Sequence, residues 1–176
     1  IGAFCSVNRL GVIVVMIVTG LNQGMQPIAG YNFGAKLYGR VNKVLRLTII
    51  YATAVTTFGF LVGMLVPDLV VGIFTSDAEL TELSVTGLRI TVMFFPIIGF
   101  QMVTSNFFQS IGMAGKAIFL SLTRQMLILL PCLLVLPQFF GVAGVWYSMP
   151  VSDLLASLIA LVMLVCQFRK FRTSPL

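Results

Sequence analysis

Residues 10–41 read LGVIVVMIVTGLNQGMQPIAGYNFGAKLYGRV, an apolar run that leads into a segment rich in glycines, amides and cations. The apolar part is long enough to cross a bilayer, which takes ~20 mainly apolar residues in a helix. Pro27 and Gly30 are predicted to weaken this helix where it leaves the membrane. Gly30 and Gly34 are predicted to permit a tight reversal there. The stretch therefore predicts a spanning helix, its exit and the entry to the next helix.

The composition assigns the whole chain to the membrane. Of its 176 residues, 59% are hydrophobic and 9% are charged, and the mean hydropathy is +1.06. A soluble domain carries about a quarter charged residues and under half apolar ones. The net charge of +6 does not indicate a nucleic-acid partner, because the basic residues lie in short connections between apolar spans.

We expect an all-α integral membrane protein that forms a single membrane domain over residues 1–176. Runs such as VIVVMIV do not alternate as the strands of a membrane barrel do, and in lipid a helix satisfies its own backbone groups. The chain starts Ile-Gly without methionine, so residue 1 is expected to be an internal position of a longer protein. The expected spanning helices cover about 5–29, 44–66, 86–110, 117–136 and 142–167.

The charges are sorted by connection, which predicts orientation. Acids without bases fall between the second and third spans, whereas cations gather in the alternate connections. By the positive-inside rule the basic side is cytoplasmic, which puts the N-terminus outside and the C-terminus inside. Trp146 and Tyr147 are expected to anchor the outer interface. Eight of the eleven cations lie on the basic side: Lys36, Arg40, Lys43, Arg46, Lys116, Arg169, Lys170 and Arg172.

A stripe of small residues marks one face of the second span. Small side chains let helix backbones approach closely, so the stripe predicts helix packing. Its members are Thr48, Ala52, Thr56, Gly59 and Gly63.

Polar residues at helical spacing indicate an internal polar space. Such residues are costly in lipid and normally face a bundle interior or a watery cavity. We expect Gln26, Gln101 and Gln109 to face one cavity. The alternative is that these amides form hydrogen bonds between helices, each worth ~0.6 kcal/mol. The candidates for a substrate or ion pathway are Gln23, Gln26, Gln101, Asn106, Gln109, Arg124 and Asp153.

Asp153 and Arg124 are the charges predicted to lie deepest. Asp153 stands about 16 Å into its span at ~1.5 Å per residue, close to the middle of a ~30 Å core. A lone charge at that depth costs at least ~2.5–3.5 kcal/mol, and pairing with Arg124 relieves the cost. Two interpretations stay open: a permanent ion pair that clamps two helices, or an aspartate that takes up and releases a proton or cation.

No enzyme signature is present, and no catalytic residue or metal site is expected. Histidine is absent, and no H-E-x-x-H or G-x-S-x-G motif occurs. The segment GMAGKA at 112–117 lacks the length and hydroxyl of a phosphate-binding loop. Cys5, Cys132 and Cys166 are scattered and odd in number, which argues against a disulfide framework.

Four segments carry a family resemblance: GLNQGMQPIAGYNFGAKLYGRV at 20–41, FFQSIGMAGKA at 107–117, SLTRQ at 121–125 and FGVAGVWYSMPVSD at 140–153. Together they resemble the last five helices of the multidrug and toxic compound extrusion (MATE) family. The resemblance implies a twelve-helix transporter of two lobes in the bacterial cytoplasmic (inner) membrane. This chain would supply helices eight to twelve, and the N-terminal lobe would be missing.

The resemblance also implies a function. Members exchange Na⁺ or H⁺ inward for the export of lipophilic, often cationic compounds, so no cofactor beyond the coupling ion is expected. Parallel repeats place the substrate cavity between lobes near the midplane. Some members have a coupling carboxylate in the tenth helix, but residues 86–110 contain no acid. The alternatives are a flippase for lipid-linked precursors from the same superfamily and a non-transporting membrane subunit.

Overall fold

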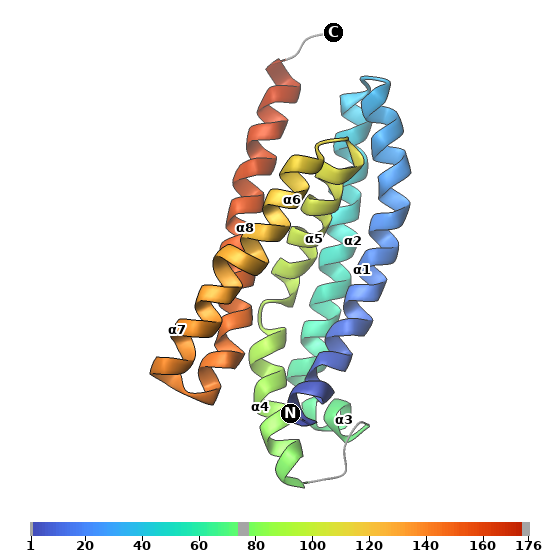
Figure 1. Ribbon diagram of the computed structural model, residues 1–176. Coiled ribbons are helices and arrows are strands. Elements are labelled where there is room, and N and C mark those ends of the chain that lie inside the picture. The colour runs from blue at the N-terminus through green and yellow to red at the C-terminus, as the bar shows by residue number, and fades with distance from the viewer. Residues whose placement is uncertain (1, 74–77, 174–176) are drawn as a thin grey trace.

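The computed structural model describes residues 2–73 and 78–173, and the regular structure within them is entirely helical (Figure 1). This confirms the expected all-α fold class. Four helices are long and apolar enough to cross a membrane, or up to five if a bent pair counts as one span. The elements are α1 (Gly2–Gly34), α2 (Tyr38–Leu65), α3 (Pro67–Gly72), α4 (Ala78–Val92), α5 (Phe95–Ser110), α6 (Ala114–Leu122), the π-helical segment η1 (Thr123–Leu129), α7 (Leu130–Phe140) and α8 (Val142–Thr173).

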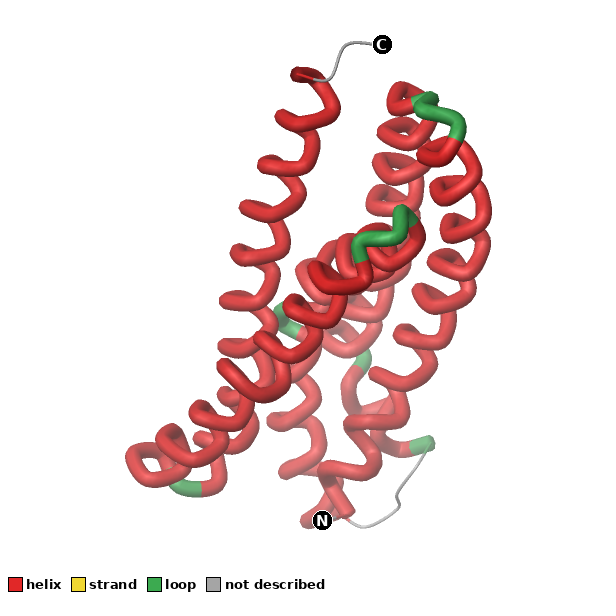
Figure 2. The backbone as a smooth tube through the Cα atoms, turned by 45° about the horizontal axis from the view of Figure 1, so that its top comes forward, coloured by secondary structure: helices red, strands yellow, loops and turns green. Residues whose placement is uncertain are grey.

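The helices form one bundle with two distinct ends. The α1–α2 turn, the α5–α6 turn and the C-terminal end of α8 lie at one end, which we call the basic end (Figures 1 and 2). The N-terminus, α3 and the α7–α8 turn lie at the other end. Helix α5 packs against α1, α2 and α8 and so forms the centre of the bundle.

The third predicted span is broken, which corrects the single helix expected over 86–110. Helices α4 and α5 meet at an angle of 51°. Pro96 stands just after the break; it has no N–H for the carbonyl of Val92, and its ring clashes with a continuing turn. The break therefore has a local cause in the sequence.

The fourth span is continuous but not uniformly α-helical. Residues Ala114–Phe140 form one rod of 27 residues through α6, η1 and α7. In η1 the backbone hydrogen bonds follow the π-helical pattern. The Leu130 N–H, for example, donates to the carbonyl of Gln125, five residues back. Pro131 follows directly and cannot donate to Leu127, so the α-helical ladder would be interrupted here in any case.

The first helix does not end where the sequence suggested. Helix α1 runs through Pro27 and Gly30 to Gly34, and the turn is made at residues 35–37 with Lys36 at φ 57°. The prediction that Gly30 and Gly34 make the reversal is therefore wrong. Gly30 has a packing role instead: a Cβ there would stand 2.9 Å from the carbonyl oxygen of Ser110, which only a glycine permits.

The small-residue stripe of α2 is buried along its whole length, as predicted. At Gly59 an added Cβ would lie 2.7 Å from Val14 of α1, and at Gly63 it would lie 2.9 Å from Val92 of α4. The stripe thus allows two helices to approach α2 closely, which is the packing role that small residues serve in membranes.

Helix α8 is set against the bundle by Trp146. The indole is buried, and a Cβ at Gly87 of α4 would stand 2.6 Å from its ring. The interpretation of Trp146 as an interfacial anchor is therefore wrong, while the neighbouring Tyr147 is exposed. The tight turn before α8 depends on Gly141, which has φ 59°.

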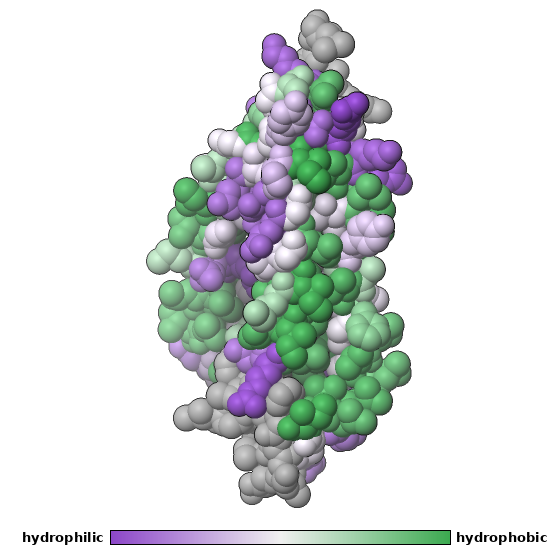
Figure 3. All heavy atoms as spheres, turned by 90° about the vertical axis from the view of Figure 1, so that its right-hand side faces the viewer, coloured by the Kyte–Doolittle hydropathy of each residue, from purple (hydrophilic) through white to green (hydrophobic). Residues whose placement is uncertain are grey.

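The outer surface of the bundle is largely apolar. On the face where α1 lies, hydrophobic residues cover much of the middle, and hydrophilic residues gather in the upper part (Figure 3). Large side chains such as Met16, Phe58 and Leu134 are exposed there and elsewhere on the bundle. A soluble surface of this kind would aggregate, so the exposed apolar surface is that of a protein in lipid.

Candidate functional site

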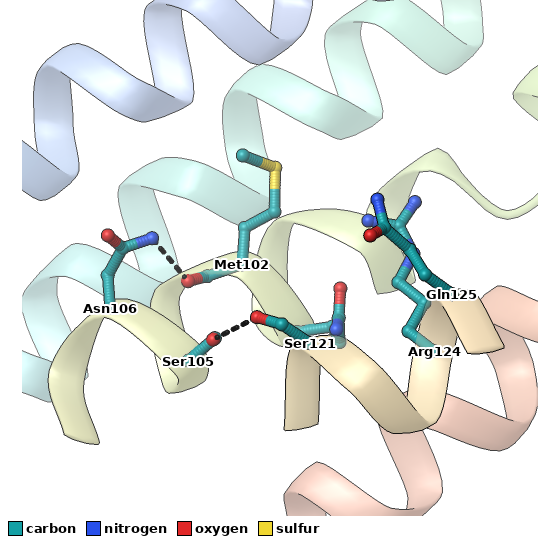
Figure 4. A pocket seen from close by; sticks show the side chains of 7 residues that line it. Met102, Ser105, Asn106, Ser121, Arg124 and Gln125 are labelled. Atoms are coloured by element: carbon teal, nitrogen blue, oxygen red, sulfur yellow. Dashed lines mark hydrogen bonds between the residues drawn. The ribbon is translucent and has the colours of Figure 1, made fainter. Parts of the chain in front are cut away.

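A polar cavity of about 290 Å³ opens between α5 and the rod formed by α6 and η1 (Figure 4). The lining residues are Gln101, Met102, Ser105 and Asn106 of α5, Ser121 of α6, and Arg124 and Gln125 of η1.

Weak polar contacts join the walls of this cavity. The hydroxyls of Ser105 and Ser121 point toward one another across it at 3.5 Å (Figure 4). Gln26 of α1 donates from Nε2 to Oδ1 of Asn106 at 3.1 Å, and Asn106 Nδ2 donates to the carbonyl of Met102. The cavity therefore connects three elements through neutral groups that can exchange partners with a ligand or water.

An ion pair lies at the edge of the cavity. Arg124 Nε donates to Asp153 Oδ1 at 2.7 Å, and the two side chains are 33% and 7% exposed. The guanidinium therefore reaches the cavity, whereas the carboxylate is enclosed between η1 and α8. Because the charges of this pair balance each other, the site can hold a polar group, and the carboxylate can exchange the guanidinium for another cation or a proton.

The structure brings together most, but not all, of the predicted polar residues. Gln101 and Asn106 line the cavity, and Gln26 reaches it through Asn106. Gln109 is exposed and lies outside the lining, so the prediction that it shares this cavity is wrong. Gln109 stands on the same face of α5 as the lining residues, but it lies roughly 12 Å along the helix from Gln101, beyond the end of the cavity.

On α1 the buried amide is not the predicted one. Gln23 is exposed, whereas the adjacent Asn22 is 1% exposed. Neither amide atom of Asn22 has a hydrogen-bond partner among the residues that the structure describes. The sequence alone does not show which of these two adjacent amides is buried, because both stand close to the polar segment at the end of the helix.

Sequence reasoning missed two lining residues, Ser121 and Gln125. They stand four residues apart and flank Arg124, so they share a helical face close to that of the arginine. This spacing could have identified them. Met102 also lines the cavity and supplies an adaptable apolar contact.

No group of acidic, cysteine or histidine side chains within the described residues could hold a metal ion. Cys132 and Cys166 are free thiols, and the side chain of Cys5 lies outside the description. The chemistry of the site is thus that of charge pairing and hydrogen bonding by amides, hydroxyls and one guanidinium.

The apolar helices and the polar cavity between them define a multi-pass α-helical membrane protein. The sequence profile of the MatE family matches residues 1–134, and the chain belongs to this family. The match includes α1 to α6 and the part of the rod that carries Arg124.

Individual relatives agree with this assignment. The multidrug export protein MepA of Staphylococcus aureus (strain MSSA476) is 25% identical over 146 residues, which cover 83% of this chain and 32% of MepA. The MATE multidrug transporter DinF-BH, whose structure is that of a ligand complex, is 36% identical with a TM-score of 0.87, over 97% of this chain and 38% of that one. An outward-facing MATE family transporter of the MOP superfamily has a TM-score of 0.90 at 19% identity. The match covers 98% of this chain and 39% of that transporter. The chain thus spans about a third of the length of the curated relatives it matches.

Proposed function

We propose that this chain forms part of an ion-coupled exporter that exchanges Na⁺ or H⁺ for lipophilic, often cationic compounds across the bacterial cytoplasmic membrane. Membership of the MatE family carries the proposal. MepA is named as a multidrug export protein, and DinF-BH is a multidrug transporter whose structure contains a bound ligand. The open polar cavity supports a transport role, because a helix bundle that serves only as a scaffold has no need of one.

In this proposal the chain supplies the last five helices of a larger transporter. The matched share of its relatives, 32% of MepA and 38% of DinF-BH, leaves room for a second lobe. That lobe would close over the polar cavity and complete a substrate site at the interface.

The coupling ion would act through a buried carboxylate. Among the acids whose side chains the structure describes, Asp153 is the one that is buried, and its partner Arg124 faces the cavity. Residues 86–110 contain no acid, so a second coupling carboxylate, if the mechanism needs one, belongs to the N-terminal lobe.

The cavity favours this function over its alternatives. A flippase for lipid-linked pyrophosphates needs several cations in its cavity, but the lining here holds one, Arg124, whose charge Asp153 balances. A sealed, non-transporting subunit would not leave about 290 Å³ open between α5 and α6.

The test is efflux by the full-length protein in cells that lack other exporters. We expect lower accumulation of a lipophilic cationic dye, and we expect an ionophore that collapses the Na⁺ or H⁺ gradient to abolish the effect. Separate collapse of the two gradients identifies the ion. Efflux that persists without either gradient and requires ATP would contradict the proposal.

A further inference from the structure

A second surface of the molecule, on the far side of α5 from the polar cavity, has features of a binding site. Helices α2 and α8 bound an open hollow of about 300 Å³ at the basic end. It is lined by Asn42, Leu45, Arg46, Ile49, Ile50 and Phe168.

A second hollow of about 410 Å³ adjoins the first. It shares Asn42 and Phe168 with it and adds Val165 and Arg169. The two hollows therefore form one groove, the α2–α8 groove, with an arginine from each helix and apolar residues between them.

The two arginines stand at headgroup depth. No charged residue follows Arg46 in α2, and none lies between Asp153 and Arg169 in α8. Each arginine is thus the last cation before a long apolar run, where a helix passes from the interface into hydrocarbon. A guanidinium has five N–H donors, so each of the two arginines can bind a phosphate oxygen and still keep another contact.

The groove continues into an apolar track. A hollow of about 610 Å³ on α2 runs from Ile49 to Leu61 and shares Ile49 and Ile50 with the arginine-lined part. Twelve residues of helix span roughly 18 Å, which is close to the ~15 Å depth of one hydrocarbon leaflet. The track therefore has the length of one acyl chain.

The charge at this end fits an anionic ligand. The segments 35–46, 111–116 and 165–173 contain eight cations and no acid. In addition, Asn42 lines both hollows and places a neutral amide between the two helices. A choline or ethanolamine headgroup would bring a cation close to two arginines, whereas a glycerol headgroup brings none.

We propose that the α2–α8 groove binds an anionic phospholipid with a phosphoglycerol headgroup. The phosphate lies between Arg46 and Arg169, the glycerol lies beside Asn42, and one acyl chain follows α2 toward Leu61. Basic pockets between membrane helices bind anionic headgroups in this way.

The test uses the purified full-length protein, stripped of lipid and titrated with phosphatidylglycerol or phosphatidylcholine, with bound lipid counted by native mass spectrometry. We expect the wild type to bind phosphatidylglycerol at least about tenfold more tightly, because both lipids carry the phosphate but only phosphatidylcholine brings a cation close to the two arginines, each worth about 1 kcal/mol. The double variant Arg46→Gln, Arg169→Gln should lose most of this preference. Inorganic phosphate should not compete, since it cannot occupy the apolar track.

The matched control is Arg40→Gln with Lys170→Gln. It removes the same charge from the same two helices at exposed positions outside the groove. Retained preference in the control supports a site. An equal loss of lipid preference in both double variants would show general surface attraction and would overturn the proposal. Unchanged preference in both would show that the two arginines do not bind the headgroup, and this result would also overturn it.

Two further variants test the track and the alternative that another helix covers it. Ala54→Trp fills the apolar hollow and should lower phosphatidylglycerol affinity severalfold without changing charge. A fluorophore on Ile50→Cys should be quenched by lipids with brominated acyl chains. Absence of quenching would mean that protein covers the groove and would overturn the proposal. Because the readouts are lipid binding and quenching, their failure leaves the transport proposal untouched.

Discussion

The two members of the Arg124–Asp153 pair stand in different surroundings. The arginine side chain is 33% exposed and borders the polar cavity, whereas the aspartate side chain is 7% exposed. If its partner is lost, the arginine can still be hydrated through the cavity, but the carboxylate is left enclosed. Breaking a buried pair by removing one partner costs about 3–5 kcal/mol when the other charge stays uncompensated.

We therefore predict an asymmetric effect of single substitutions in the full-length protein. Arg124→Gln should lower the free energy of unfolding by roughly 3–5 kcal/mol, and Asp153→Asn by clearly less. Asp153→Asn should fold normally but uncouple dye efflux from the ion gradient. Thermal unfolding in detergent and efflux in cells measure the two effects.

The double variant separates the two roles of the pair. If Arg124→Gln with Asp153→Asn regains both stability and coupled efflux, the pair is only a clamp between η1 and α8. If it regains stability but not coupling, the aspartate belongs to the mechanism. Normal folding and transport in every variant would show that Asp153 is simply hydrated.

Contact between α4 and α8 depends on a glycine, and this leads to a prediction for these elements. Gly87→Ala places a Cβ 2.6 Å from the buried Trp146 ring, which cannot move aside as a flexible side chain would. Such overpacking costs about 1–3 kcal/mol. The control is Gly115→Ala in α6, where an added Cβ would have no atom of the described residues within 4 Å. A drop in melting temperature for Gly115→Ala as large as that for Gly87→Ala would refute the steric argument.

The bend between α4 and α5 is predicted to depend on Pro96. Pro96→Ala restores an N–H for the Val92 carbonyl, so the 51° bend should open. Spin labels at the exposed positions Thr86 and Gln109 should then move apart by roughly 3 Å, estimated from helix rise. Pro150→Ala, in the unbroken α8, should leave this distance unchanged. An unaltered distance in Pro96→Ala would show that tertiary packing imposes the bend.

These elements show how far sequence reasoning reaches. Apolar runs and the small-residue stripe of α2 predicted the helices and their packing, because both depend on local composition and period. The 51° break and the π-helical segment were not predicted, although Pro96 and Pro131 signal them. Conversely, Pro27 was expected to weaken the first helix near its end, yet α1 continues through it to Gly34. A proline removes one hydrogen bond, and packing decides whether the helix ends there, bends or continues.

The candidate site was predictable only in part for a related reason. Residue type and depth pointed to Arg124, Asp153 and Gln101, and the structure places them at or beside one cavity. Spacing at i+4 placed Gln109 on the correct face of α5, but spacing does not show how far the cavity extends along the helix. Nor could it distinguish Gln23 from Asn22, since that choice depends on the exact rotation of α1.

At the scale of the whole molecule, the two ends differ in charge. The turn at 35–37, the turn at 111–113 and the end of α8 meet at the basic end, and α3 with Asp68 lies at the opposite end (Figure 1). The bundle thus joins in space the cations that the sequence separates into alternate connections. Asp77 and the side chain of Arg172, which would report on the same arrangement, lie outside the described residues.

The last prediction is that the basic end faces the cytoplasm. Lys and Arg near span ends resist translocation, so an end with eight cations and no acid should stay inside. In a full-length protein whose cysteines are replaced by serine, Ala35→Cys and Asp68→Cys offer exposed positions at the two ends. An impermeant thiol reagent applied to intact cells should label position 68 and leave position 35 unlabelled until the membrane is opened. Labelling of both positions in intact cells would break the five-span arrangement, because it puts the two ends of the bundle on one side. Labelling of position 35 alone would invert the orientation, and the arginines of the α2–α8 groove would then face the outer leaflet.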